Sequence, residues 1–410
     1  MKVKYISAVF MAALLLSGCA AGGSTLETEE AAESPMLTEA PATEPAAPET
    51  TEAQETEPTL SPGEEILSAM TLREKVGQLF IVRPDALDLT PEGDADVTSL
   101  TPEMEETLKE YPVGGFVQFG KNIENPEQIL SFNYSLYEAC PIAPFLAVDE
   151  EGGLVARLAK KDSFNLPKFE SAAAVGAEGP EAALQMGRTI GAYVSQYGFN
   201  MDFAPVADTF TNPQNTVIGT RAFSSDPRQA AACARAMADG LIENHILPVF
   251  KHFPGHGDTV EDSHEKLPVV HKTVEELMDC EWIPFLEAGP EDCMMSAHIA
   301  LPEVTGNMIP ATMNRAIIQD CLREKLGYAG LVITDAMEMA AIAETYSSGE
   351  AALMALQAGC DIVLMPPSLP EAFEAVAAAA EDGSFPMEEL DARVLKILTV
   401  KLRHQIILPQ

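Results

Sequence analysis

Basic and aromatic residues are scarce in this sequence. Lys and Arg number 25 against 63 Asp and Glu, which gives a formal net charge of −38 at pH 7, and the 410 residues include one Trp and eight Tyr. A surface with this charge repels nucleic acid and anionic lipid headgroups, so the sequence argues against nucleic acid as a partner. The hydrophobic fraction of 47% is nevertheless enough for a sizeable folded core.

Motifs that would define several other protein classes are missing. No Gly-x-Gly-x-x-Gly follows the first expected strand and no phosphate-binding loop occurs, which argues against a dinucleotide or nucleotide cofactor. None of the seven cysteines lies in a Cys-x-x-Cys pair, so a zinc site lacks its usual spacing. A disulfide framework is unusual in so long a chain, and we expect buried thiols at positions 140, 233, 280, 293, 321 and 360.

The first nineteen residues have the pattern of a secretory signal. Lys2 and Lys4 precede a short apolar run, residues 6–16, which is followed by Leu16-Ser17-Gly18-Cys19. The run is too short for a permanent membrane-spanning helix. The last four residues resemble the lipobox of bacterial lipoproteins, so we expect a lipoprotein signal peptide at 1–18 and lipidation of Cys19. The protein would then be extracytoplasmic and anchored to the cell membrane; the alternative is a plain signal peptide with an incidental cysteine.

A change of composition separates this signal from the rest of the chain. Residues 20–65 contain twelve Glu and six Pro but no Lys, Arg or Asp. Such a segment cannot bury enough apolar surface to offset the entropy lost on ordering, and its charges repel one another. We therefore predict a disordered acidic tether at 19–65 and one folded domain at 66–410.

Within this domain one pattern recurs eight times: a short apolar run, a polar turn and a segment of helical periodicity. Apolar strands alternating with helices indicate a parallel sheet, and eight such units favour a single (β/α)8 barrel over a Rossmann-like open sheet. The expected helices are 180–197, 227–245, 274–286, 315–326, 349–358 and 387–402. The expected strands are Leu79–Val82, Gly115–Phe119, Phe145–Val148, Met201–Ala204, Pro248–Phe250, Met294–Ala297, Leu331–Thr334 and Ile362–Met365.

Ionisable residues follow four of these strands. Asp149 comes after the third, Lys251-His252 after the fifth, His298 after the sixth and Asp335 after the seventh. The carboxyl ends of barrel strands form the active face, so these side chains are candidates for one site. Polarity from turn chemistry alone is the alternative, and for Asp335 in particular an N-cap of the next helix.

The segment from 251 to 264 concentrates three of the seven histidines. A metal site is one interpretation, but Phe-Pro-Gly separates His252 from His256 and prevents the helical turn that an i, i+4 ligand pair needs. Acid–base chemistry fits better, because Asp262 and His264 can approach one another in a turn and the carboxylate would raise the pKa of the imidazole. We expect no metal and no cofactor.

These residues carry a resemblance to a known family. Lys-His-Phe-Pro-Gly-His-Gly followed by Asp-Ser-His resembles the signature of glycoside hydrolase family 3, and within it the β-N-acetylglucosaminidase (NagZ-like) branch. Further matches are Val148–Gly153 with Arg157, Asn200–Asp208, Ile218–Phe223 and Ile333–Asp335. The resemblance extends from about residue 66 to residue 402. Leu154, Glu150 and Ala336 depart from the usual pattern and leave subsite preference open.

The resemblance implies a TIM-barrel domain and a role for each matching residue. Asp335 would be the nucleophile, His264 the general acid/base and Asp262 its partner. The hydroxyls of the terminal sugar would be held by Asp149, Arg157, Arg221, Lys251 and His252. The implied activity is exo-acting, retaining removal of terminal N-acetylglucosamine (GlcNAc) from cell-wall-derived or related amino sugars. The alternatives are a β-glucosidase or xylosidase, a phosphorolytic relative, and a solute-binding lipoprotein.

Overall fold

The computed structural model describes residues 60–90, 96–259 and 266–408. The predicted signal peptide, Cys19 and most of the tether lie outside these residues. The boundary predicted at 65/66 is wrong by a few residues, because helix α2 already begins at Pro62. The Ser61 hydroxyl accepts a hydrogen bond from the Glu64 N–H, and the Glu64 carboxylate accepts one from the Ser61 N–H. Gly63, in the first turn of α2, lies against Leu395. This capping box orders the end of a segment whose composition alone predicts disorder.

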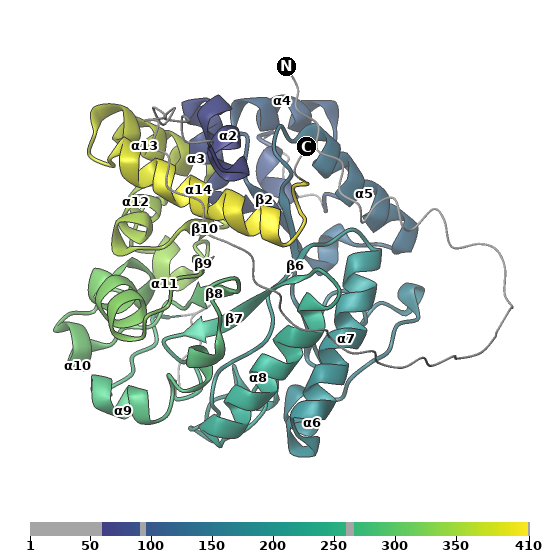
Figure 1. Ribbon diagram of the computed structural model, residues 1–410, viewed down its shortest axis with the longest axis vertical. Helices are drawn as coiled ribbons and strands as arrows, with labels where there is room; N and C mark the ends of the chain where they lie inside the picture. Colours follow the sequence, from purple (N-terminus) through teal and green to yellow (C-terminus); the bar gives the residue numbers. More distant parts are fainter. Residues whose placement is uncertain (1–59, 91–95, 260–265, 409–410) are drawn as a thin grey trace, which may run out of the picture.

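Eight parallel strands close into a barrel in the order β1-β10-β9-β8-β7-β6-β3-β2 (Figure 1). The single (β/α)8 barrel predicted from the repeated pattern is therefore confirmed, and each expected run overlaps one barrel strand. A two-stranded hairpin, β4 (Glu150–Gly152) and β5 (Val155–Ala156), is inserted after the third of them. The barrel strands are β1 Phe80–Val82, β2 Gly115–Gln118, β3 Phe145–Val148, β6 Met201–Asp202, β7 Leu247–Phe253, β8 Cys293–Ser296, β9 Leu331–Ala336 and β10 Ile362–Leu364.

Helices surround this barrel, as Figure 1 shows. Several begin at a Ser, Thr, Asp or Asn cap that accepts a backbone N–H, for example Asn125 and Asp226. Gly198 and Gly327 follow helices with φ of 81° and 73°, the left-handed conformation that favours glycine. The α-helices after α2 are α3 Leu72–Gln78, α4 Pro102–Glu110, α5 Pro126–Ala139, α6 Ala172–Glu178, α7 Pro180–Gln196, α8 Pro227–Ile242, α9 Val274–Asp279, α10 Pro302–Thr305, α11 Ala340–Ala343, α12 Ser348–Ala358, α13 Leu369–Asp382 and α14 Met387–Arg403.

The helix expected at 274–286 is shorter than predicted. α9 ends at Asp279, and a separate 3₁₀ turn, η5, covers Pro284–Glu287. Proline has no N–H and its ring clashes with the carbonyl four residues earlier, so Pro284 is incompatible with a continuous helix through Cys280. The break carries Trp282 into the core, where it is fully buried and donates its indole N–H to the Pro254 carbonyl at 3.1 Å.

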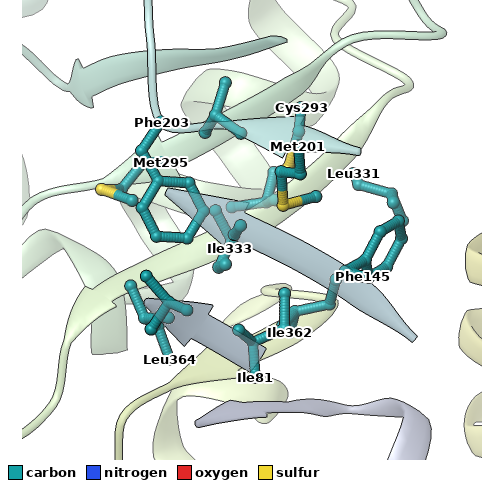
Figure 2. Packing of buried hydrophobic residues seen from close by; sticks show 14 of the residues in the cluster. Ile81, Phe145, Met201, Phe203, Cys293, Met295, Leu331, Ile333, Ile362 and Leu364 are labelled. Carbon is teal, nitrogen blue, oxygen red and sulfur yellow. The ribbon is translucent and has the colours of Figure 1, made fainter. Parts of the chain in front are cut away.

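The interior of the barrel is filled by alternate residues of the strands. Figure 2 shows Ile81, Phe145, Leu331 and Ile333 among the side chains that meet there. Successive side chains of a strand point to opposite faces, so the residues two positions further on continue the inward-facing rows. In this way apolar packing at the bottom of the barrel fixes which side chains reach the axis at its carboxyl end.

The described residues carry six free cysteines. Four of them are buried, as predicted, whereas Cys140 and Cys280 are partly exposed.

No helix in the described ranges is both long enough and apolar enough to cross a membrane.

Candidate active site

The candidate residues converge on the carboxyl end of the barrel. Asp149 follows β3, Lys251 and His252 lie on β7, and Asp335 lies on β9. Arg221 ends a 3₁₀ turn, η4 (Gly219–Arg221), in the loop between β6 and α8. Direct contacts join Lys251, Arg221, His252 and Arg157 to Asp149 or to the buried Glu151 and to one another. Asp335 lies in the electrostatic field of His298, His252 and Lys251. Asp262 and His264 lie outside the described residues, so their predicted roles stay predictions.

Two cations share a buried carboxylate at the centre of this network. Lys251 Nζ lies 2.6 Å from Asp149 Oδ1 and 2.7 Å from Glu151 Oε1. The Arg221 guanidinium donates two hydrogen bonds to the Glu151 carboxylate, at 2.8 and 2.7 Å, and a third to the Val217 carbonyl at 3.0 Å. Sequence reasoning missed Glu151, although it lies in the Asp-Glu-Glu-Gly-Gly segment. Its position depends on partners 70 and 100 residues away in the chain.

Electrostatics keep these groups charged. Burial by itself would raise the pKa of Glu151, but Lys251 and Arg221 outweigh it and hold that pKa far below its usual value. Burial would likewise lower the pKa of Lys251, yet the Asp149 and Glu151 carboxylates leave it raised. An ammonium and a guanidinium are therefore held in fixed positions, which suits recognition of sugar hydroxyls by charge-assisted hydrogen bonds.

A second buried carboxylate orients the histidines. Asp208 Oδ2 lies 2.7 Å from His252 Nδ1, and Asp208 Oδ1 accepts the His256 N–H at 2.6 Å. The Nε2 atom of His252 then faces Arg221 NH2 at 3.4 Å. Burial would raise the pKa of Asp208, but His252 and His256 keep it lowered. Asp208 lies in a motif that matches the family, but the sequence gives it no role; the structure shows that it positions His252.

The described residues after β7, 254–259, form turns rather than a helix, as the Pro-Gly interruption indicates. The peptide bonds Lys251–His252 and Phe253–Pro254 are cis. A Cβ at Gly257 would lie 1.8 Å from the Thr209 carbonyl oxygen, so only glycine permits this close packing. His256 is fixed by Thr259, whose Oγ1 lies 2.7 Å from His256 Nδ1. Burial lowers the pKa of His256.

Asp335 occupies an inward-facing position near the end of β9. It continues the row of Leu331 and Ile333, and its Oδ1 accepts the Ala336 N–H at 2.8 Å. Asp335 is not an N-cap, because the next helix, α11, is preceded by Met339 and has no side-chain cap. The N-cap alternative for Asp335 is thus wrong.

The charge of Asp335 is stabilised by its neighbours. Burial would raise its pKa, but His298, His252, the Ala336 N–H and Lys251 together leave the pKa lowered. Sequence reasoning expected Lys251 to supply this field, whereas the imidazoles contribute more. His298 is itself positioned by the Thr312 hydroxyl and the Ala336 carbonyl, each at 3.0 Å. Asp335 is therefore an ionised carboxylate whose charge is favoured by His298, His252 and Lys251.

Arg157 is placed by its backbone as much as by its side chain. The buried Glu150 carboxylate accepts the N–H groups of Arg157, Leu158 and Ala159 at 2.6, 2.8 and 2.9 Å. The guanidinium then lies over the Phe119 ring and 3.4 Å from Asp149 Oδ2.

Within the described ranges no set of three His, Cys, Asp or Glu side chains is arranged to bind a metal ion.

These contacts define a class of protein. Carboxylates, guanidinium groups and imidazoles gathered at the carboxyl ends of (β/α)8 strands form the site of a barrel enzyme. The family follows from comparison: the model of the glycosyl hydrolase family 3 N terminal domain matches residues 71–400. The chain belongs to this glycoside hydrolase family, as its sequence motifs predict.

Curated relatives and solved structures agree with this placement. The chain is 33% identical over 346 residues to the β-hexosaminidase A of Pseudoalteromonas piscicida, covering 76% of this chain and 57% of that protein. It is 36% identical over 288 residues to a β-hexosaminidase of Xylella fastidiosa (68% and 84%). A family 3 β-N-acetylglucosaminidase from Paenibacillus superposes with a TM-score of 0.76 at 33% identity (82% and 63%). The chain thus spans less than two thirds of two of these three proteins.

Proposed function

We propose that the protein is an exo-acting, retaining β-N-acetylglucosaminidase that removes terminal GlcNAc from cell-wall-derived or related amino sugars. The observation that carries this proposal is the ionised Asp335, which faces the barrel axis at the end where Lys251, Arg221 and His252 are fixed. The names of the relatives, β-hexosaminidase and β-N-acetylglucosaminidase, supply the sugar.

The residues divide between the two chemical steps of retention. In the first, an Asp335 oxygen attacks the anomeric carbon, the glycosidic bond breaks, and His264 gives its proton to the leaving oxygen. In the second, His264 takes a proton from water, the hydroxide attacks the anomeric carbon, and the bond to Asp335 breaks. Asp262 orients His264 and stabilises its charged form. Two inversions restore the β configuration.

The terminal sugar is held by groups whose positions are already fixed. Lys251 has three N–H donors, of which two point to Asp149 and Glu151, so one is available for a hydroxyl. Asp149 offers acceptors to vicinal hydroxyls, and His252, Arg157 and Arg221 surround it. A group of donors and acceptors of this kind suits a single terminal ring. The single Trp is buried at 282 rather than exposed as a platform for a long chain.

The nucleophile is tested with Asp335→Asn, which keeps the shape and removes the charge. We expect release of 4-nitrophenol from its N-acetyl-β-glucosaminide to fall by at least about a thousandfold, since a covalent step loses its nucleophile. A 5-fluoro sugar should label Asp335 in the wild type, read by peptide mass spectrometry. Full activity of the variant would rule out the nucleophile assignment, and full activity of His264→Ala on disaccharides would rule out the dyad.

Three alternatives differ from this proposal: in the sugar that is released, in the molecule that accepts it, or in having no catalytic activity. A β-glucosidase or xylosidase would prefer aryl glucosides or xylosides, and a phosphorylase would release GlcNAc 1-phosphate in phosphate buffer. A solute-binding lipoprotein would release nothing and needs no ionised nucleophile.

We also propose that the protein is anchored to the membrane through a lipid on Cys19. Cys19→Ser should move the protein from the membrane fraction to the soluble extracytoplasmic fraction.

A further inference from the structure

Two buried carboxyl groups that the proposed mechanism does not use lie behind the sugar-binding residues. Glu150 begins the β4–β5 hairpin, directly after Asp149, and Asp202 ends β6. Both side chains are fully buried, and Asp202 Oδ1 accepts the Glu150 N–H at 2.9 Å. Two neighbouring anions in the interior would be costly, so the surroundings of each group decide which one carries a charge.

The surroundings of the Glu150 side chain favour its ionised form. Its Oε2 accepts the N–H groups of Arg157 and Leu158, and its Oε1 accepts the Ala159 N–H and, at 3.0 Å, the hydroxyl of Tyr193 on α7. Burial raises the pKa of Glu150, and these four donors oppose that rise. With two donors on each oxygen the site has no place for a proton, so it fits a carboxylate.

The surroundings of Asp202 favour its neutral form. Its Oδ1 accepts the one N–H of Glu150, whereas its Oδ2 has no hydrogen-bond partner among the described residues. Burial raises the pKa of Asp202 well above its usual value, and the nearby Glu150 charge adds to this effect. A buried carboxylate with a single donor is unfavourable, so Asp202 holds a proton where Glu150 holds a charge.

The charge of Glu150 matters because the Arg157 side chain has few contacts of its own. The guanidinium meets Asp149 at 3.4 Å and lies over the Phe119 ring, and its buried Nε has no hydrogen-bond partner in the part of the chain that the structure describes. Arg221, by contrast, donates two short hydrogen bonds to one carboxylate. The position of Arg157 therefore depends on its backbone.

Glu150 fixes that backbone from two sides. Its main chain pairs with Ala156, the residue before Arg157, in the β4–β5 hairpin. Its side chain accepts the next three N–H groups, beginning with that of Arg157. A small displacement of a group that binds a substrate can lower the rate steeply, so the hairpin needs such a fixed end.

We propose that the ionised Glu150 is a positioning residue, which holds Arg157 in place for a hydroxyl of the terminal sugar, and that the neutral Asp202 keeps a second charge away from it. This inference rests on the proposed function and deepens it by adding a residue that acts without touching the substrate. Glutamine at position 150 would turn an N–H₂ group toward backbone donors. Asparagine at position 202 keeps the acceptor for the Glu150 N–H and resembles the neutral acid.

The first test is a double-mutant cycle on 4-nitrophenyl N-acetyl-β-glucosaminide, with wild type, Glu150→Gln, Arg157→Ala and the double variant. We expect Glu150→Gln to lower kcat/KM at least about tenfold, mainly through KM, but at most about twofold when Arg157 is already Ala. Asp202→Asn should lower kcat/KM by no more than about threefold, because its acceptor remains. Tyr193→Phe removes one donor and keeps the ring, so it should show the same dependence on Arg157 at a smaller size, even if Glu150→Gln does not fold.

A second measurement does not depend on activity. Hydrogen exchange of the amides of residues 157–159, read by mass spectrometry, should become faster in Glu150→Gln relative to the rest of the barrel and stay slow in Asp202→Asn. The matched control is Asp361→Asn. Asp361 is another buried carboxylate that accepts a strand N–H, that of Val332 at 2.8 Å, but it lies at the amino end of the barrel. This variant should leave KM and the relative exchange of residues 157–159 unchanged.

The outcomes separate this role from the proposed function. If Glu150→Gln lowers kcat/KM by the same factor with and without Arg157, or if Asp202→Asn costs as much as Glu150→Gln, the proposed pair of roles is wrong. Unchanged exchange at 157–159 in Glu150→Gln would also overturn it. If exchange responds as expected but the wild type releases no 4-nitrophenol, Glu150 positions the hairpin and the proposed function is wrong.

Discussion

Two fully buried lysines occupy opposite ends of the barrel. Lys251, at the carboxyl end, contacts the carboxylates of Asp149 and Glu151. Lys401, on α14 at the amino end, donates to Gln78 Oε1 at 2.7 Å and to the Gly114 carbonyl at 2.9 Å, and lies 4.6 Å from the centre of the Phe145 ring. Both ammonium groups are buried, yet within the described ranges only Lys251 has anionic partners.

The difference shows what each end of the barrel requires. Carboxylates outweigh burial and raise the pKa of Lys251, whereas burial lowers the pKa of Lys401 to about 7. Lys251 remains charged over the working range of an enzyme and can donate to a substrate. Lys401 satisfies two carbonyl groups between β1, β2 and β3 and serves packing. Chemistry lies at the carboxyl ends of the strands and stability at the amino ends.

Removing the functional lysine should have the largest effect. Lys251→Met leaves Glu151 and Asp149 partly uncompensated, so we expect the free energy of unfolding to fall by about 3–5 kcal/mol. Activity should also fall by at least about a hundredfold, because a fixed donor is lost. Urea unfolding and kcat/KM on the aryl substrate measure the two effects.

The control for this substitution is Lys396→Met. Lys396 also pairs with a carboxylate, that of Asp361 at 2.9 Å, but at the amino end of β10. It should lose stability without a comparable loss of kcat/KM. Equal losses of activity in both variants would contradict the division between the two ends.

The second lysine should make stability depend on pH. In the unfolded chain Lys401 binds its proton up to a pKa of about 10.5, whereas in the folded protein it releases it near 7. The unfolded state thus holds more protons between these values, and the contribution of Lys401 to the free energy of unfolding rises with pH. The slope is at most about 1.4 kcal/mol per pH unit.

Lys401→Met should therefore flatten the dependence of unfolding free energy on pH between about 7 and 10. Urea titrations of both proteins at several pH values give this difference directly. Parallel curves for the wild type and the variant would mean that Lys401 remains protonated in the fold.

The smallest effect concerns catalysis. Because Lys401 is separated from the site by the packed interior of the barrel, Lys401→Met should change kcat/KM at neutral pH by no more than about twofold, as expected of a residue away from the reacting groups. The aryl substrate assay at 25 °C, below any unfolding, provides the measurement. A large loss would place the amino end of the barrel in the catalytic mechanism.

Much of the fold was predictable because the strands are short and apolar on both faces. Eight runs such as Phe145–Val148 are separated by turn residues. Parallel strands that are buried on both faces are continuously apolar, so they can be recognised without an alternation of apolar and polar residues. The prediction of a continuous helix over 274–286 was wrong because Pro284 is incompatible with one, and the break lets Trp282 donate its indole N–H to the Pro254 carbonyl. The start of the domain was misplaced because one local cap at Ser61 overrides composition.

The sequence predicts a site residue when that residue directly follows a strand. It does not predict the role of a residue that acts by positioning another side chain. Asp149, Lys251 and Asp335 could be identified from their places after apolar runs. Glu151 and Asp208 could not be assigned a role, because their charges are explained only by Arg221 and His252, which the fold brings to them. Contacts across 44 to 70 residues of chain leave no local pattern.

The sequence by itself determined the barrel, the family and the residues that carry charge at the strand ends, since these depend on periodicity and on motifs that are contiguous in the chain. Only the tertiary structure decided which charges meet. It paired Lys251 with two carboxylates and, among the described residues, left Lys401 with none. The physical reason is that pKa values and free donors depend on distance in space, and closing the barrel sets those distances.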